Sequence, residues 1–279
     1  MNKLGLIAGG GALPVNLAEH CQSAGRAYFV IRLKGFASSE LARLPGADIG
    51  LAELGRGIRA LKQAGCQSVC MAGHVDRPDF RKLRPDLRGL AALPGVILAA
   101  RKGDDGLLRF LVREFEKEGF TVEGAHQVMG ALTLSEGPLG RYGPDDTHQA
   151  DIARAMQVAR AMGALDVGQG AVCCEGLVLA VEAQEGTDAM LRRVMELPEA
   201  IRGAPGRPRG VLAKACKPGQ ETRVDLPTIG VATLQRCARA GIAGIAGEAG
   251  RLLVLDRDKV VEVADQLGLF VVGLTARDD

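Results

Sequence analysis

The chain has 279 residues, of which 47% are apolar and 24% charged, so it can bury a sizeable core and is not a disordered protein. A formal charge of +2 and few aromatic residues (seven Phe, two Tyr and no Trp) disfavour nucleic-acid binding, which needs a field of positive charge and rings that stack on bases. The seven cysteines are irregularly spaced, which fits a reducing compartment better than a disulfide framework.

The start of the chain gives no sign of export. Met1 leads directly into an apolar strand pattern, without the basic region and small-residue cleavage site of a signal peptide. No apolar run approaches the ~20 residues of a membrane span. We therefore expect a cytoplasmic protein.

The first half of the chain alternates strand patterns with helix patterns. Strand patterns cover 4–8, 28–33, 47–54 and 68–73, and helix patterns cover 13–25 and 56–65. Such an alternation predicts parallel βαβ units, as in a Rossmann-like sheet. A helix pattern at 106–119 and a strand pattern at 120–125 follow. We predict a first domain at 1–132.

A stretch dense in Gly, Pro and Asp then predicts a linker at 133–146. Beyond it the patterns are a helix, a hairpin turning at Glu175–Gly176, a helix, two strands, a helix and a strand: 147–162, 170–183, 187–197, 210–217, 241–256, 257–268 and 269–274. We predict a second domain at 147–279. The predicted fold class is α/β, with an N-terminal Rossmann-like parallel sheet, a C-terminal α/β domain with a mixed sheet, and a cleft between them.

The stretch AGGGALP at 8–14 lies between the first strand and the first helix. Glycines let the backbone approach a ligand, and the N–H groups at a helix start attract phosphate. Gly9 and Gly11 match two positions of the dinucleotide fingerprint, but Pro14 stands at the third, and the next strand ends in basic residues. The stretch indicates a phosphate or nucleotide site rather than an NAD site. The alternative is a plain strand-to-helix turn.

A second motif, MAGHVDRP at 71–78, follows the fourth strand pattern. Ligands of parallel sheets bind beyond the carboxyl ends of strands, so we expect Gly73 and His74 beside the glycine loop. His74 could bind phosphate or transfer a proton, or it could be a loop histidine without a role.

In RKGDDGLL at 101–108, Asp104 and Asp105 open a helix pattern. Capping explains at least one of them, since acidic residues are favoured at helix starts. The functional alternative is a carboxylate that binds Mg²⁺.

The densest set of polar residues lies in the second half of the chain. One strand-to-helix junction carries Glu182, Glu185, Thr187 and Asp188. Gly- and Pro-containing turns further on carry Lys214, Lys217, Gln220, Arg223, Asp225 and Thr228. Such a set can bring together a phosphate ester, a divalent ion and an activated water. Asp225, between Val224 and Leu226, is a candidate metal ligand or water-positioning base. The alternative is a surface loop with ordinary salt bridges.

The apolar run GLAALPGVILAA at 89–100 is closely flanked by Arg and Lys. A buried connection is the preferred interpretation of so short a run in a soluble domain. The alternative is an element that meets lipid, with its cations on lipid phosphates.

Five motifs together carry a resemblance. They are LGLIAGGGALP, AGHVDRP, GDDGLLR, EGTDAML and KPGQETRVDLPTIG, in this order over almost the whole chain. The chain thereby resembles the LpxI family of UDP-2,3-diacylglucosamine pyrophosphatases. One departure is QET at 220–222, where the family pattern has QD before the Arg.

The resemblance implies a two-domain enzyme of lipid A synthesis that hydrolyses UDP-2,3-diacylglucosamine to 2,3-diacylglucosamine 1-phosphate (lipid X) and UMP, with Mg²⁺ or another divalent ion. It implies that Asp225 is the essential acidic residue and a metal ligand, with Lys214 and Asp188 as further catalytic residues. It implies that Gly10, Gly11 and Ala12 face the nucleotide, with Gly73 and His74 in the adjoining turn. The remaining substrate-binding residues it implies are Thr187, Lys217, Gln220 and Thr228.

A substrate with two acyl chains implies an enzyme peripheral to the cytoplasmic face of the inner membrane, and a homodimer is plausible. Two other functions remain open. One is another UDP-sugar enzyme, such as a glycosyl or nucleotidyl transferase, which would need an acceptor. The other is a nucleotide-binding module without catalysis, which would bind UDP compounds and release no UMP.

Overall fold

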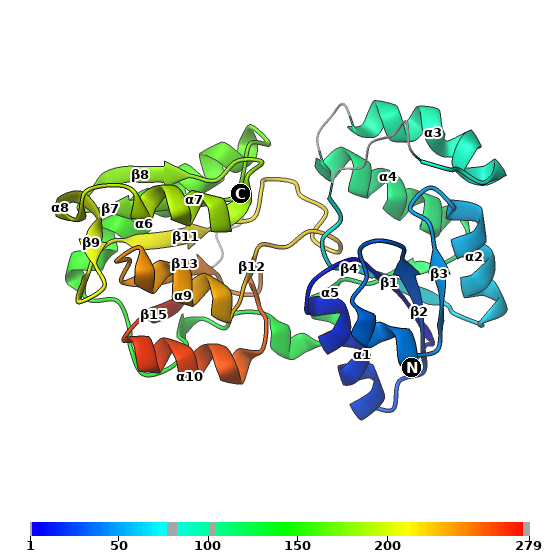
Figure 1. The fold of residues 1–279 in the computed structure, drawn as a ribbon, viewed down its shortest axis with the longest axis horizontal. Helices are drawn as coiled ribbons and strands as arrows, with labels where there is room; N and C mark the ends of the chain where they lie inside the picture. Colours follow the sequence, from blue (N-terminus) through cyan, green and yellow to red (C-terminus); the bar gives the residue numbers. More distant parts are fainter. Residues whose placement is uncertain (1, 77–82, 101–103, 276–279) are drawn as a thin grey trace. The chain divides into compact units, whose positions relative to one another are not determined.

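The computed structural model describes residues 2–76, 83–100 and 104–275. The chain divides into two compact units, each with its own large sheet (Figure 1). The first unit comprises Met1–Gly130 and Arg223–Asp225, and the second comprises Ala131–Thr222 and Leu226–Asp279. A short segment from the second half of the sequence therefore packs with the first unit.

The N-terminal unit is built on a five-stranded parallel sheet in the order β3-β2-β1-β4-β5. Its strands are β1 (Leu4–Ala8), β2 (Tyr28–Leu33), β3 (Gly46–Ile49), β4 (Ser68–Ala72) and β5 (Thr121–Val122). This order is that of a Rossmann-like sheet. The predicted parallel sheet is confirmed.

The helices of this unit are α1 (Leu13–Ser23), α2 (Leu54–Gln63), α3 (Leu87–Ala100), α4 (Asp104–Lys117) and the short α5 (Ala125–Val128), with a 3₁₀ turn η1 (Ser39–Arg43). Helices α2 and α4 share one core with the sheet, because Ile58 and Leu61 of α2 and Val112 of α4 face Ile31 and Val69 of the strands. The spacing of three residues between Ile58 and Leu61 places both on one face of the helix.

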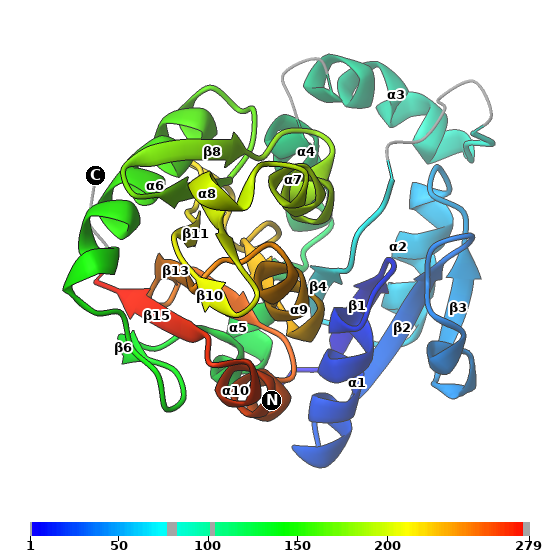
Figure 2. The same ribbon diagram turned by 60° about the vertical axis from the view of Figure 1, so that its left-hand side comes forward.

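The apolar run at 89–100 forms most of α3, which packs beside α2 and α4 (Figures 1 and 2). Its interpretation as a buried connection is wrong, because the side chains of Leu90 and Leu98 are exposed. On the face of α3 toward α4, the absence of a side chain at Gly95 allows close packing, because a Cβ there would lie 2.6 Å from the ring of Phe110. Within the described ranges no helix is long and apolar enough to cross a membrane.

The C-terminal unit is built on a six-stranded sheet in the order β6-β15-β13-β11-β7-β8. Its strands are β6 (Gly137–Pro138), β7 (Gly170–Cys174), β8 (Leu177–Val181), β11 (Val211–Lys214), β13 (Gly244–Glu248) and β15 (Phe270–Leu274). Strands β11, β13 and β15 run parallel, whereas β7, β8 and β6 pair antiparallel with their neighbours. The predicted mixed sheet is confirmed. β6 lies within the stretch interpreted as a linker and pairs with β15.

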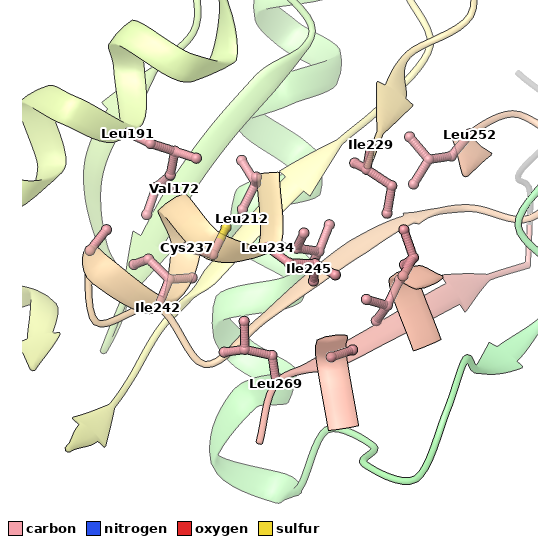
Figure 3. Close-up of a cluster of buried hydrophobic side chains, with 14 of the residues drawn as sticks. Val172, Leu191, Leu212, Ile229, Leu234, Cys237, Ile242, Ile245, Leu252 and Leu269 are labelled. Atoms are coloured by element: carbon pink, nitrogen blue, oxygen red, sulfur yellow. The ribbon is translucent and has the colours of Figure 1, made fainter. Parts of the chain in front are cut away.

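Helices cover both faces of this sheet. α6 (Asp146–Ala164) packs on one face, where Ile152 and Met156 contact Val211 and Ala213. On the other face α7 (Gly186–Met195), α9 (Val231–Arg239) and α10 (Arg257–Leu267) enclose a second core, in which Leu191 and Leu234 meet Leu212 (Figure 3). The smaller elements are α8 (Glu199–Arg202), β9 (Gly203–Ala204), β10 (Arg207–Pro208), β12 (Thr228–Ile229) and β14 (Leu253–Val254).

Two turns show how the sequence determines where strands of the C-terminal sheet end. The predicted hairpin turns at Glu175 and Gly176, both with positive φ, and the Asp151 carboxylate accepts the two N–H groups of the turn. The strand pattern at 241–256 is broken into β13 and β14, because Gly250 (φ +73°) turns the chain and donates its N–H to the carbonyl of Leu134.

Candidate functional site

The glycine loop and the His74 turn lie against each other at the carboxyl ends of β1 and β4, as predicted. The Gly10 N–H donates to the His74 carbonyl (2.8 Å), and the His74 N–H donates to the Gly10 carbonyl (3.1 Å). A Cβ on Gly10 would lie 2.8 Å from Cε1 of the His74 ring, and one on Gly73 would lie 2.5 Å from the Gly10 carbonyl oxygen. The turn therefore requires glycine at position 73, which also has a positive φ of +88°, whereas a Cβ at position 10 would require the His74 ring to shift.

The loop leads directly into α1. Gly11 has a φ of +87°, which glycine adopts without strain, and Ala12 is the residue before the helix. Ala12 supplies no side-chain cap to the first N–H groups of α1, and Pro14 occupies the first turn. The strand end, the glycines and the helix start thus have the arrangement that holds anionic groups in sheets of this kind.

A second cluster forms in the C-terminal unit around Lys214, the last residue of β11. Lys214 is 4% exposed, and its Nζ donates to Oγ1 of Thr187 at the start of α7 (2.7 Å) and to the Thr228 carbonyl (3.4 Å). The Thr187 hydroxyl in turn donates to Oε1 of Glu182, which directly follows β8 (2.7 Å). A charged lysine is thus fixed in a buried polar network at the end of a strand.

Lys217 and Gln220 form the turn beyond β11. The Lys217 N–H donates to the Gln220 side chain (2.9 Å), and its Nζ pairs with Asp166 (2.7 Å), just after α6. A Cβ on Gly163 of α6 would lie 3.2 Å from the Lys217 Cα. The turn is therefore held on the end of α6, with Gln220 buried beneath it.

Of the other predicted residues, Thr228 joins the Lys214 cluster through its carbonyl, and its hydroxyl donates to the Leu226 carbonyl (3.1 Å). Asp188 lies next to Thr187, but its carboxylate pairs with Arg236 of α9 (3.0 Å) and is half exposed. The described contacts of Asp188 are those of a surface ion pair.

Asp225 belongs to the segment Arg223–Asp225, which groups with the N-terminal unit although the residues on both sides of it belong to the C-terminal one. Val224 packs against the core of that unit, and Arg223 pairs with Glu116 of α4 (2.8 Å). The chain thus leaves the C-terminal unit after Thr222 and re-enters it at Leu226, two residues before β12.

The two other predicted metal ligands stand at the start of α4. The Asp105 carboxylate accepts a hydrogen bond from Nε of Arg109 one turn further on (2.6 Å), whereas the side chain of Asp104 lies outside the described residues. In the described part of the chain no three His, Cys, Asp or Glu side chains gather as a metal site.

The buried cysteines are not candidate nucleophiles. Burial raises the pKa of the Cys70 and Cys237 thiols to about 12 and that of Cys173 to about 11, so that they stay protonated at neutral pH. They pack as small core residues.

Glu182 is the main residue that sequence reasoning did not select as a site residue. It was visible as one of several acidic residues at a strand-to-helix junction, but nothing in the sequence joined it to Lys214, 32 positions further on. The signal that singles it out is its position directly after a strand and five residues before a threonine at a helix start.

A parallel sheet ending in a glycine loop, and a mixed sheet ending in a buried lysine network, fit the class of α/β enzymes that act on phosphate-containing substrates.

The chain belongs to the LpxI family. Residues 3–132 match the family model of the LpxI N-terminal domain, and residues 135–272 match that of the LpxI C-terminal domain. The chain is 66% identical over 278 residues to the UDP-2,3-diacylglucosamine pyrophosphatase LpxI of Caulobacter vibrioides. The aligned residues cover 100% of this chain and 99% of that protein.

Proposed function

We propose that this chain hydrolyses the pyrophosphate bond of UDP-2,3-diacylglucosamine to UMP and 2,3-diacylglucosamine 1-phosphate in lipid A synthesis. Similarity over the full length to a protein named for that reaction supports the substrate. The observation that carries the chemistry is the buried Lys214 at the end of β11, fixed on Thr187. An ammonium group held in place can offset the charge that develops on a phosphate in the transition state.

In this proposal the two units have different roles. The turns of the N-terminal unit, with Gly10, Gly11 and Ala12 beside Gly73 and His74, hold the nucleotide side of the substrate through backbone groups. Around the pyrophosphate, Lys214 and Lys217 offset phosphate charge, Asp225 orients the attacking water, and the remaining polar contacts come from Thr187, Asp188, Gln220 and Thr228. The proposal includes a cleft in which the residues of both units contact the same substrate molecule.

Mg²⁺ is the proposed cofactor, and the donor set decides which residues fit it. Mg²⁺ commonly binds one or two carboxylates together with substrate phosphates and water, so a single carboxylate such as Asp225 suffices on the protein side. Asp105 fits less well, because its carboxylate already accepts a hydrogen bond from Arg109. When bound, Mg²⁺ would withdraw charge from the phosphate oxygens.

The decisive experiment incubates the purified chain with UDP-2,3-diacylglucosamine in Mg²⁺ or in EDTA and measures UMP. Release of UMP without an acceptor supports hydrolysis, whereas release only after addition of an acceptor would identify a transferase. Thermal stabilisation by UDP compounds without UMP release would identify a binding module. In ¹⁸O-water we expect the label in lipid X, through attack at the β-phosphorus; label in UMP would place the attack at the α-phosphorus.

We further propose that the enzyme works on the cytoplasmic face of the inner membrane and meets it through α3. The outward face of this helix carries only apolar residues, at i, i+3, i+4, i+7, i+10 and i+11: Leu87, Leu90, Ala91, Pro94, Ile97 and Leu98. The exposed fractions of Leu87, Leu90 and Leu98 are 90%, 57% and 60%. Such a stripe is typical of a helix that lies in a membrane interface.

Charge favours a bilayer with anionic lipid as the occupant of this stripe. Residues 81–102 include six Lys and Arg and a single Asp, so this segment holds a charge of +5 in a chain whose total is +2. Asp86 is engaged within the protein, where it accepts the N–H groups of Arg56 and Gly89. Basic residues beside an apolar helix face attract anionic headgroups.

Flotation with vesicles of phosphatidylethanolamine and phosphatidylglycerol tests the membrane proposal. We expect the chain to float with the vesicles, and Leu90→Asp combined with Leu98→Asp to abolish flotation while turnover of substrate in detergent micelles stays unchanged. Flotation of the double variant at the wild-type level would contradict the assignment. If the wild type were a dimer and the double variant a monomer, the stripe would instead be assigned to contact with a second copy of the chain.

A further inference from the structure

Glu182 occupies a place that the surrounding backbone is shaped to admit. It directly follows β8, is 6% exposed, and donates its backbone N–H to the Gly170 carbonyl (2.8 Å). A Cβ on Gly170 would lie 2.4 Å from Oε2 of Glu182, and a Cβ on Gly168 would lie 2.0 Å from its carbonyl oxygen. Gly170 at the start of β7 thus makes room for the carboxylate, and Gly168 makes room for the backbone of the same residue.

The hydrogen bonds around Glu182 have a fixed direction. An ammonium group can only donate, so the Thr187 oxygen must accept from Lys214 (2.7 Å). The single proton of the Thr187 hydroxyl is then directed to Oε1 of Glu182 (2.7 Å). The carboxylate therefore determines how Thr187 is oriented, and Thr187 determines where the Lys214 Nζ lies.

The second carboxylate oxygen is not explained by stability. Oε2 of Glu182 is buried and has no hydrogen-bond partner among the described residues, and it lies 3.8 Å from the Lys214 Nζ, at the limit of an ion pair. A buried ion pair with an unsatisfied oxygen stabilises a fold less than a pair of apolar side chains of similar size would. Groups of this kind are retained where a function needs them.

We infer that Glu182 is a positioning residue of the hydrolysis: its carboxylate orients the Thr187 hydroxyl and supplies the negative charge that holds the Lys214 ammonium at the end of β11. This inference rests on the proposed function, because it assigns Glu182 its role through the contact of Lys214 with the substrate phosphates. Glu182 itself does not touch the substrate. Its contribution therefore affects the charge and position of Lys214 more than the binding of UDP-2,3-diacylglucosamine.

The test compares kcat, KM and melting temperature in the full-length enzyme. Glu182→Gln keeps the size of the side chain and an acceptor for Thr187 but removes the charge and turns an amide N–H₂ toward Lys214. We expect kcat to fall by at least ~10-fold and KM to change by less than ~3-fold. The melting temperature should also fall, because the buried Lys214 ammonium loses its charged partner. A wild-type kcat in Glu182→Gln would overturn the inference.

Asp151→Asn is the matched control. Asp151 is also a buried carboxylate, 3% exposed, but it caps the turn at the opposite end of β7 from Gly170. We expect this variant to lower the melting temperature and to leave kcat and KM unchanged. If Glu182→Gln behaves in the same way, Glu182 has a structural role only and the inference fails.

Two further variants keep the result interpretable. Glu182→Asp retains the charge and should lose less kcat than Glu182→Gln; the reverse order would overturn the inference, and this variant decides it should Glu182→Gln not fold. In a Thr187→Val background, Glu182→Gln should lower kcat much less than it does alone, whereas additive losses would contradict action through Thr187. A wild-type enzyme that releases no UMP would refute the proposed function itself, and is distinguished from these outcomes in the first assay.

Discussion

The two units of this protein build their candidate sites from different materials. The N-terminal turns around Gly10 and Gly73 are joined by backbone hydrogen bonds; they leave no room for a side chain at Gly73, and the His74 ring lies against Gly10. The C-terminal cluster around Lys214 and Glu182 consists of buried charged side chains joined by hydrogen bonds. Close backbone approach suits the binding of a neutral or anionic ligand surface, whereas fixed charges suit a reaction in which charge develops. We therefore expect substitutions in the N-terminal turns to affect substrate binding and substitutions in the C-terminal cluster to affect kcat.

Asp225→Ala has the largest expected effect, because Asp225 is the proposed metal ligand and water-orienting group. We expect UMP release to fall by at least ~10³-fold while the variant still binds the substrate, measured by calorimetry. Asp225 is proposed to act in the chemistry although its segment packs with the N-terminal unit, to which we assign binding. A variant that retains turnover but loses binding would place Asp225 with the binding region.

Lys214→Met should lower kcat by about 10²-fold, the usual loss for a group that stabilises transition-state charge. It should also destabilise the protein by about 3–5 kcal/mol, because Glu182 is left as an unpaired buried charge. Adding Glu182→Gln should restore much of the stability without restoring activity, as measured by thermal unfolding and UMP release. Recovery of kcat in this double variant would show that Lys214 is dispensable for the reaction.

Gly10→Ala should act on binding. The added Cβ would meet the His74 ring at 2.8 Å and displace the turn, so we expect KM to rise by about 10-fold with a smaller change in kcat. Gly206→Ala is the control: like Gly10 it has no positive φ, but a Cβ there meets nothing within 4 Å. The control should keep its KM, with a stability within about 1 kcal/mol of the wild type. An equal rise of KM in both variants would show that the contact with His74 is not the cause.

The sequence predicts the elements of this fold well where local patterns suffice. Strand and helix periodicity predicted the parallel sheet, and the pair Glu175–Gly176 predicted the hairpin turn. The meeting of Gly10 with His74 followed from the rule that ligands gather at the carboxyl ends of parallel strands.

Long-range relations were not predictable in the same way. The apolar run of α3 looks the same whether it is buried or exposed, because its composition does not show which neighbours cover it. The packing of Val224 with the N-terminal core and the network from Glu182 to Lys214 join residues far apart in the sequence. No spacing rule links such residues, so only the folded chain shows them.

Glu123→Gln has the smallest expected effect and sharpens the comparison from the other side. Glu123 forms a two-bond ion pair with Arg26, which also donates to Ser68 at the start of β4, the end of the sheet opposite the glycine loop. The Arg26 guanidinium holds the pKa of the Glu123 carboxyl below its usual range. Since the folded-state pKa is depressed, the pair contributes stability above the unfolded pKa, near 4.3.

That contribution is lost as the pH falls through the folded pKa of Glu123. We therefore expect Glu123→Gln to cost about 1–2 kcal/mol at neutral pH and progressively less in acid, with kcat and KM unchanged, from urea unfolding at several pH values and from UMP release. Glu182→Gln should differ from it by lowering kcat, because it removes the charge that holds Lys214. If both substitutions lowered stability and neither lowered kcat, Glu123 and Glu182 would both have a structural role only. Glu182 would then no longer support the assignment of the chemistry to the C-terminal unit.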